Sequence, residues 1–269
     1  MGIKRILVFI IGVNVIAWGG ILLLKGLIED PALATSTAVS LITLGPVAMA
    51  VILRLILKEN WSQAGLKLNL RGNGKWYLFA VAFPMVVIGT VYLLGIISGT
   101  GSFTSDMAGG TAKVLQMVSI MFFPMFFASI GEEFGWRGYL EPSLHKVTGS
   151  PLLTHVIVGV VWGVWHFPIL ILNDPDIQSV DLLAVVIGCT GLAIIYGQLK
   201  LRTGSVWPCV LLHAASNTFN IAFGIGKLMD FDKDSTGLVS LNSTSLAVVS
   251  TYLLIAFLFA RQLKKDATA

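Results

Sequence analysis

Eight long apolar runs dominate this sequence and limit what it can fold into. Most contain 16 to 23 residues, close to the length of about 20 that an α-helix needs to cross about 30 Å of hydrocarbon. Apolar and polar residues do not alternate strictly within the runs, so helices are favoured over the strands of a transmembrane barrel. The runs are Ile6–Leu24, Ala34–Leu53, Trp76–Ser98, Val114–Gly131, Leu152–Leu172, Leu182–Gln198, Val206–Phe223 and Leu241–Ala260. Each is expected to be a membrane-spanning helix.

The composition supports the same fold class. Charged residues make up only 12% of the 269 residues, about half the share that soluble globular domains carry. The predicted fold class is therefore all-α: a polytopic membrane helix bundle of about eight transmembrane helices. The runs follow one another without a fixed-period repeat or a separate soluble domain, so residues 1–269 are interpreted as a single integral-membrane domain.

The distribution of basic residues predicts an orientation. If Lys4 and Arg5 are cytoplasmic and eight spans alternate, all but four of the 18 Lys and Arg residues fall on the cytoplasmic side. The positive-inside rule then predicts that both termini are cytoplasmic. The net charge of +4 is explained by these loops, and we expect no nucleic acid as a partner.

The longest cytoplasmic loop in this arrangement runs from about residue 54 to residue 75. It combines basic residues with Trp61 and with alternating Leu66, Leu68 and Leu70. Such a mixture suits the lipid headgroup region, and a plain solvated loop fits it equally well.

Small residues and a proline indicate how the helices meet. Gly131 and Gly135, and likewise Gly159 and Gly163, lie four residues apart and place small residues on one helix face. This spacing permits close approach between helix backbones, although it is common by chance. Pro168 could kink its helix and open a cavity, or it could be an ordinary kink of a membrane helix.

Two adjacent glutamates at the end of an apolar run are the most informative polar residues. Glu132 and Glu133 follow a stretch from Val114 to Ile130 that carries no acidic residue. A charge at the centre of a membrane helix costs roughly 2.5–3.5 kcal/mol, so such groups are usually functional. Glu133 and Arg137 are spaced for a helical ion pair, which could also simply cap the helix end. Glu132 points about 100° away, and a second carboxylate in an apolar site suits proton transfer.

Two further apolar runs are interrupted by residues that can handle protons or donate hydrogen bonds. His166 lies in the fifth run, and His213 lies in the seventh with Asn217 one turn later. Each could be a hydrogen-bonding residue between helices. Because three separate helices each contribute such a group to an otherwise apolar bundle, we predict that they form one functional site.

Three motifs in this sequence resemble those of a known family. They are Glu132-Glu133-x-x-x-Arg137, Trp162-x-x-x-His166 and His213-x-x-x-Asn217. In order and spacing they resemble the CPBP family of CAAX proteases and bacteriocin-processing enzymes, also called the Abi family, which includes the Ras-converting endopeptidase. Trp162 stands where the commoner pattern has Phe. The motif-bearing core covers about residues 114–223.

The resemblance implies a glutamate intramembrane endopeptidase. It implies that Glu132 is the general base on a water molecule, that His166 helps to hold this water, and that His213 and Asn217 donate to the oxyanion. Glu133 and Arg137 would orient the first glutamate or bind substrate.

The resemblance also implies partners and a prokaryotic origin, and the charge distribution implies that the site faces the cytoplasm. The expected partners are membrane lipids and a peptide or lipid-anchored protein substrate, of CAAX type or a bacteriocin or leader peptide. The expected location is the plasma membrane of a prokaryote, with the active site facing the cytoplasm.

No cofactor or metal is expected. Two histidines and a glutamate could ligate zinc, but the sequence contains no H-E-x-x-H motif and the resemblance implies metal-free chemistry. Cys189 and Cys209 lie in different runs and are interpreted as packing residues. The alternative function is a proton-coupled transporter or a non-catalytic membrane binding or regulatory protein, because intramembrane Glu and His also form proton relays.

Overall fold

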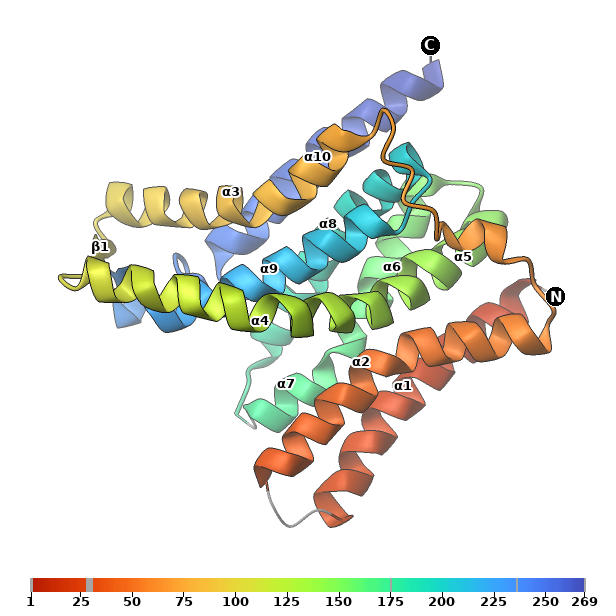
Figure 1. Cartoon of the computed structure of the whole chain (residues 1–269), viewed down its shortest axis with the longest axis horizontal. Coiled ribbons are helices and arrows are strands. Elements are labelled where there is room, and N and C mark those ends of the chain that lie inside the picture. Colours follow the sequence, from red (N-terminus) through yellow and green to blue (C-terminus); the bar gives the residue numbers. More distant parts are fainter. Residues whose placement is uncertain (1, 28–30, 175, 236, 269) are drawn as a thin grey trace.

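The computed structural model describes residues 2–27, 31–174, 176–235 and 237–268, and it is built almost entirely of helices (Figure 1). The end residues 1 and 269 of the predicted domain lie outside this range. Each of the eight predicted apolar runs lies largely in helix. The long helices are α1 (Gly2–Leu27), α2 (Pro31–Ile56), α3 (Gly74–Ser98), α4 (Met107–Gly135), α6 (Pro151–Trp165), α8 (Ser179–Thr203), α9 (Trp207–Gly226) and α10 (Leu246–Thr268). The chain is thus an all-α polytopic membrane protein.

Six helices of the described residues are long and apolar enough to cross a membrane. They are Gly2–Gly20, Gly74–Ser98, Met107–Thr148, Pro151–Asn173, Ser179–Thr203 and Trp207–Gly226. The apolar helices Ile42–Ile56 and Leu246–Gln262 are shorter. The count of eight spans and the cytoplasmic position of both termini stay predictions.

Two of the runs depart from the predicted continuous helices. The fifth run divides at His166 into α6 and the short α7 (Phe167–Asn173). Pro168 lies in the first turn of α7, where the missing N–H has no helical partner to lose. In the interior of one continuous helix, the same proline would remove a hydrogen bond. The last run begins five residues before α10, because residues 241–245 form turns.

A π-helical turn follows α4 and was not predicted. This turn, η2 (Trp136–Leu140), joins α4 to α5 (Glu141–Thr148). Pro142 has no N–H to donate to the carbonyl of Gly138 four residues earlier. The guanidinium of Arg54 donates to that carbonyl instead, at 2.8 Å. Arg54 of α2 therefore supplies the hydrogen bond to the Gly138 carbonyl that Pro142 cannot donate.

Close packing of α4 against α2 depends on two glycines. A β-carbon added at Gly131 would lie 2.7 Å from the carbonyl oxygen of Thr43, and one at Gly135 would lie 2.6 Å from the carbonyl carbon of Pro46. The helix backbones thus touch where the two glycines face α2, as their spacing predicted.

The second glycine pair does the same between α6 and α8. A β-carbon at Gly159 would lie 2.4 Å from the α-carbon of Thr190, and one at Gly163 would lie 2.7 Å from that of Val186. Both predicted close approaches are confirmed, and together they fix α4 and α6, which carry two of the three motifs.

A small antiparallel ladder joins two connections that are far apart in sequence. β1 (Gly101–Phe103) follows α3, and β2 (Met229–Phe231) follows α9. Gly101 pairs with Phe231, and Phe103 pairs with Met229. The all-α prediction did not include this ladder, which ties the end of α3 to the end of α9.

The segment of residues 57–73 crosses the opposite end of the bundle and contains the 3₁₀ helix η1 (Trp61–Ala64). It is attached mainly through its backbone: the carbonyl of Gly65 accepts from the N–H of Val206 at 2.9 Å, and that of Leu66 accepts from the indole of Trp207 at 2.8 Å. Its leucine side chains stay exposed. This segment is therefore fixed to α9, and whether its leucines enter lipid stays a prediction.

Candidate functional site

The last turn of α4 places two adjacent carboxylates in different surroundings. Glu133 is fully buried, whereas 7% of Glu132 is exposed. Successive residues of a helix are separated by about 100°, so neighbours in sequence face different partners. The close contact of Gly131 and Gly135 with α2 holds this end of α4.

Glu133 belongs to a closed polar cluster, which we call the buried cluster and define as Glu133, Arg137 and His213. Glu133 Oε1 accepts from Arg137 Nη1 at 3.0 Å and lies 2.8 Å from His213 Nδ1. The guanidinium carbon of Arg137 lies 4.7 Å from the ring centre of Trp162 and 4.5 Å from that of Tyr196. Arg137 is thus held between two aromatic rings while it neutralises Glu133.

Glu132 faces a different set of groups. Trp162 Nε1 donates to Glu132 Oε2 at 2.9 Å, and His213 Nε2 lies 3.9 Å from Glu132 Oε1. The latter distance is too long for a direct hydrogen bond. One oxygen of Glu132 is therefore oriented by the indole, and the other faces the imidazole of His213.

His166 lies at the break between α6 and α7. Its Nδ1 is 2.8 Å from the carbonyl oxygen of Trp162. A carbonyl oxygen only accepts, so Nδ1 carries the proton and neutral His166 has its lone pair on Nε2. The break positions His166 as a hydrogen-bond acceptor.

These residues surround one cavity, which we call the site cavity. Its volume is about 230 Å³, and its walls include the predicted residues Glu132, His166, His213 and Asn217. The structure thus brings together four residues from three separate parts of the chain. Glu133 and Arg137 have no exposed surface and are not part of the wall, so they support the site from behind rather than facing the cavity.

Other residues of the cavity wall were not recognised in the sequence. Ser216 and Asn220 line the cavity together with His213 and Asn217. The four residues form one stripe of α9, since their spacing is that of positions i, i+3, i+4 and i+7. Ser216 and Asn220 could have been found in the sequence by following the polar residues of this helix face from His213 onward.

Both cysteines are free, but they differ in position. Cys209 is buried, as expected for a packing residue, whereas Cys189 is half-buried. Cys189 lines the site cavity, with Sγ 3.9 Å from His166 Nδ1. Packing is thus an incomplete description of Cys189. Among the residues that the structure describes, no three His, Cys, Asp or Glu side chains are grouped so that they could hold a metal ion.

The similarity to known proteins lies in the part of the chain that carries the site. Residues 114–219 match the family model of type II CAAX prenyl endopeptidases, Rce1-like. CAAX prenyl protease 2 of Methanococcus maripaludis is 31% identical over 91 residues, which are 34% of this chain and 32% of that protein. The match thus spans about a third of that relative's length. Every residue from Glu132 to Asn217 lies inside the matched family segment.

Proposed function

We propose that this chain is an intramembrane endopeptidase of the CPBP family, on the premise that the segment that carries its site is similar to that family. Its reaction would be hydrolysis of a peptide bond in a membrane-associated or lipid-anchored substrate. The observation that carries the proposal is the site cavity, where Glu132 meets His166, His213 and Asn217 from two other parts of the bundle.

Glu132 is the proposed general base. Because Trp162 Nε1 holds Oε2 at 2.9 Å, Oε1 is left to take a proton from water. The water oxygen then forms a bond to the carbonyl carbon of the substrate, and the carbonyl electron pair becomes an oxyanion. When the C–N bond breaks, Glu132 returns the proton to the leaving amine. General-base help of this kind contributes roughly 10²–10⁴-fold to the rate.

His166 and Asn217, which line the same cavity from two other parts of the chain, complete this mechanism. The lone pair on His166 Nε2 would accept a hydrogen bond from the attacking water. The side-chain amide of Asn217 would donate to the oxyanion, a contribution of roughly 2.7–4 kcal/mol in comparable sites.

The role of His213 depends on its proton. If Nδ1–H donates to Glu133, Nε2 carries a proton only when the ring is an imidazolium. Donation from His213 to the oxyanion therefore requires the charged ring. In that form, Glu132, Glu133, Arg137 and His213 together carry no net charge.

The proposed substrate is a CAAX-type peptide, because the similar archaeal protein is named a CAAX prenyl protease. A bacteriocin or leader peptide is the second substrate class. Membrane lipids surround the enzyme, and the proposed location is the plasma membrane of a prokaryote. The charge distribution supports a site that is reached from the cytoplasmic side.

The test uses the full chain in lipid nanodiscs and a farnesylated, fluorescent CAAX peptide. Wild-type protein should cleave the peptide, Glu132→Gln should reduce kcat at least 100-fold, and both should have the same unfolding midpoint. Glu59→Gln is the control, since Glu59 pairs with Arg5, neither residue lines the site cavity, and the change should leave cleavage intact. Equal cleavage by Glu132→Gln would overturn the proposal. Proton-coupled uptake into proteoliposomes that is lost in Glu132→Gln would instead support a transporter.

A further inference from the structure

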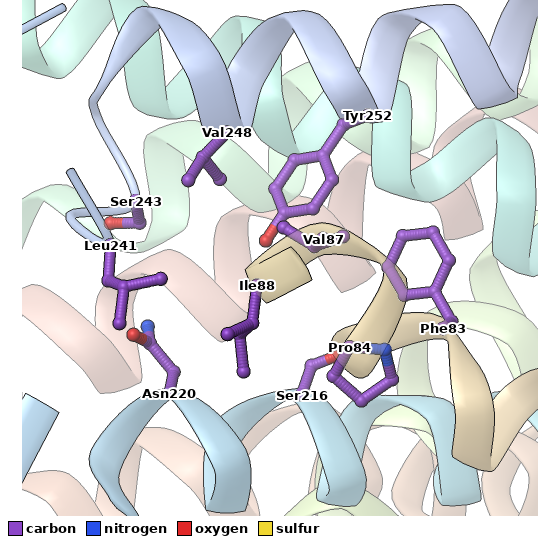
Figure 2. Close-up of a pocket in the computed structure, with 10 residues that line it drawn as sticks. All are labelled: Phe83, Pro84, Val87, Ile88, Ser216, Asn220, Leu241, Ser243, Val248 and Tyr252. Atoms are coloured by element: carbon purple, nitrogen blue, oxygen red, sulfur yellow. The ribbon is translucent and has the colours of Figure 1, made fainter. Parts of the chain in front are cut away.

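A cavity at one end of the bundle lies apart from the proposed active site. We call it the end pocket; its volume is about 410 Å³. The small cavity between α3, α9 and α10 shares Tyr252 with the site cavity and belongs to that site (Figure 2). By contrast, none of the described residues that line the end pocket also lines the site cavity. The end pocket is therefore a separate feature of the molecule.

The end pocket lies between α5, α6 and the last turn of α8, at the end of the bundle that the segment of residues 57–73 crosses. Gln63 of that segment and Leu201 of α8 are exposed at its rim. The distribution of basic residues predicts that this end is cytoplasmic. The volume lies within the range of about 300–1,000 Å³ that is typical of small-ligand pockets. The predicted orientation therefore puts a pocket of ligand size at the level of the lipid headgroups.

Two buried side chains of the end pocket carry polar atoms without a partner. Glu141 is 5% exposed and His155 is 1% exposed. Neither Glu141 Oε2 nor His155 Nδ1 has a hydrogen-bond partner among the described residues. The two atoms lie 3.8 Å apart, which is too long for a direct hydrogen bond. Because buried polar atoms are usually paired, we expect a group of a ligand to contact both.

The position and the proton of His155 are set by α8. A β-carbon added at Gly197 would lie 2.1 Å from His155 Nδ1, so the glycine makes room for the ring. The amide nitrogen of Gln198 lies 3.3 Å from His155 Nε2. Because an amide nitrogen only donates, Nε2 of the neutral ring accepts and Nδ1 carries the proton. A hydroxyl group fits this arrangement, since it can accept from His155 Nδ1 and donate to Glu141 Oε2.

The wall of the end pocket also carries an excess of positive charge. Among the described residues that line it, Lys146 and Lys200 face one carboxylate, that of Glu141. Lys200 Nζ donates to the backbone carbonyls of Arg137 and Gln63, and an ammonium group has a third N–H for an anion. Lys146 is exposed at the rim. A phosphoglycerol group carries the two features that this wall suits, a hydroxyl and a phosphate a few bonds apart.

The surroundings of the end pocket favour a ligand that is anchored in lipid. Leu201 at the rim is 47% exposed, and Leu153 in the first turn of α6 is 49% exposed. Exposed leucines at this place can pack against acyl chains, whereas a soluble phosphate ester has no apolar part to cover them. Basic pockets between membrane helices on the cytoplasmic side are typical sites for anionic lipid headgroups.

We propose that the end pocket binds the phosphoglycerol headgroup of an anionic membrane lipid. The glycerol hydroxyl lies between Glu141 and His155, and the phosphate lies beside Lys146 and Lys200. The proposal does not depend on the peptidase function, because the end pocket and the site cavity have separate walls. Since the lipid binds only the folded protein, it should also raise the unfolding midpoint.

The experiment measures lipid binding to the full-length protein in detergent by native mass spectrometry. Phosphatidylglycerol is compared with phosphatidylmethanol, which has the same charge but no free hydroxyl, and with phosphatidylcholine, all with the same acyl chains. Phosphatidylglycerol should bind at least about 10-fold more tightly than phosphatidylmethanol, because its hydroxyl bonds to a charged group. Phosphatidylcholine should bind more weakly than either. Equal dissociation constants for phosphatidylglycerol and phosphatidylmethanol would overturn the proposal.

Two variants test where the hydroxyl lies. Glu141→Met removes its acceptor and keeps both lysines, so the preference for phosphatidylglycerol should disappear while phosphatidylmethanol binds at least as well as before. His155→Phe should remove the preference by deleting the donor. Unfolding midpoints show whether each variant is folded, and the comparison of lipids on wild-type protein stands without either. A folded variant that keeps the full preference would overturn the assigned position.

A matched pair of lysines tests the phosphate. Lys146→Gln should weaken binding of phosphatidylglycerol and phosphatidylmethanol alike, by about fivefold. Lys113→Gln is the control, because Lys113 is also exposed but does not line the end pocket, and it should leave both dissociation constants unchanged. Equal losses in the two variants would indicate a general attraction of charge and overturn the site.

A last arm separates a lipid from a soluble ligand. Glycerol 3-phosphate added at the same concentration as phosphatidylglycerol should leave the lipid bound, because it lacks the acyl chains. Displacement of the lipid by this soluble ester would overturn the assignment to a membrane lipid.

Discussion

Glu132 and Glu133 are neighbours in sequence but belong to two different regions of the molecule. Glu133 lies in the buried cluster, where one oxygen contacts both Arg137 and His213. Glu132 lines the site cavity, where the indole of Trp162 is its one hydrogen-bond donor among the described residues. The same residue type thus occupies a closed, neutralised environment on one side of the helix and an open one on the other.

This difference predicts that Glu133 stabilises the fold and that Glu132 takes part in the reaction. A buried charge is tolerated when it is paired, and removing one partner is costly. Oε1 of Glu132 accepts no direct hydrogen bond among the described residues, since His213 Nε2 lies 3.9 Å away, so it can exchange a proton with water. Substitutions of Glu133 or Arg137, which do not reach the cavity wall, should therefore change stability, while substitutions in the site cavity should change turnover.

The largest effect is expected from Arg137→Met, which tests the buried side. It leaves Glu133 buried opposite His213 alone and should lower the free energy of unfolding by about 3–5 kcal/mol. Thermal unfolding of purified protein in detergent measures this loss. Glu133→Gln/Arg137→Met removes both charges and should recover most of it; a single variant as stable as wild type would break the comparison.

Asn217→Ala tests the cavity side. It should reduce kcat by a factor that corresponds to about 2.7–4 kcal/mol, with an unfolding midpoint close to that of wild type. The control is Asn14→Ala, because Asn14 donates to its own helix at the carbonyl of Ile10. If Asn217→Ala chiefly unfolds the protein, the amide joins helices and does not serve the reaction.

Two glycines sharpen the comparison by testing what holds the end of α4. Gly135→Ala would place a β-carbon 2.6 Å from the backbone of Pro46, whereas the nearest atom to a β-carbon at Gly138 is 3.6 Å away. Overpacking of this kind typically costs about 1–3 kcal/mol. Gly135→Ala should therefore lower the unfolding midpoint clearly more than Gly138→Ala, and equal shifts would contradict the close contact with α2.

The smallest effect is expected from removing metals. Protein treated with a chelator and shown by elemental analysis to be metal-free should cleave the CAAX peptide near neutral pH as fast as untreated protein. Loss of activity on stripping, with recovery on adding one equivalent of Zn²⁺, would replace the glutamate mechanism by a zinc mechanism, because two histidines and a glutamate are suitable ligands.

Features that repeat locally in the sequence predicted much of this architecture. Apolar runs of membrane-crossing length each lie largely in helix, and the glycine pairs of α4 and α6 make the close contacts that their spacing indicated. The sequence also predicted that Glu132, His166, His213 and Asn217 come together. Polar groups in membrane helices are costly in lipid, so they face the interior of the bundle and one another.

Contacts between distant elements could not be read from local patterns. The pairing of β1 with β2 and the hydrogen bond from Arg54 to the carbonyl of Gly138 are examples. In neither case does the local sequence indicate the distant partner. Trp162 looked like an ordinary aromatic residue of a motif, and only the fold shows that its indole orients Glu132. Tyr252 was missed for the same reason, since α10 reaches the cavity only through tertiary packing.

The ladder between β1 and β2 has a consequence for the time scale of substrate access. It holds α3 near α9 at one end, while at the other end the hydroxyl of Tyr77 on α3 donates to the carbonyl of Leu68. With both ends fixed, α3 cannot swing away from its neighbour as a rigid rod without breaking these bonds. Helix displacements of that kind take microseconds to milliseconds, whereas exposed side chains rotate within picoseconds to nanoseconds. Asn220 and Ser243 line the site cavity and are exposed, so access that needs only their rotation would be much faster than access that needs a movement of the helices.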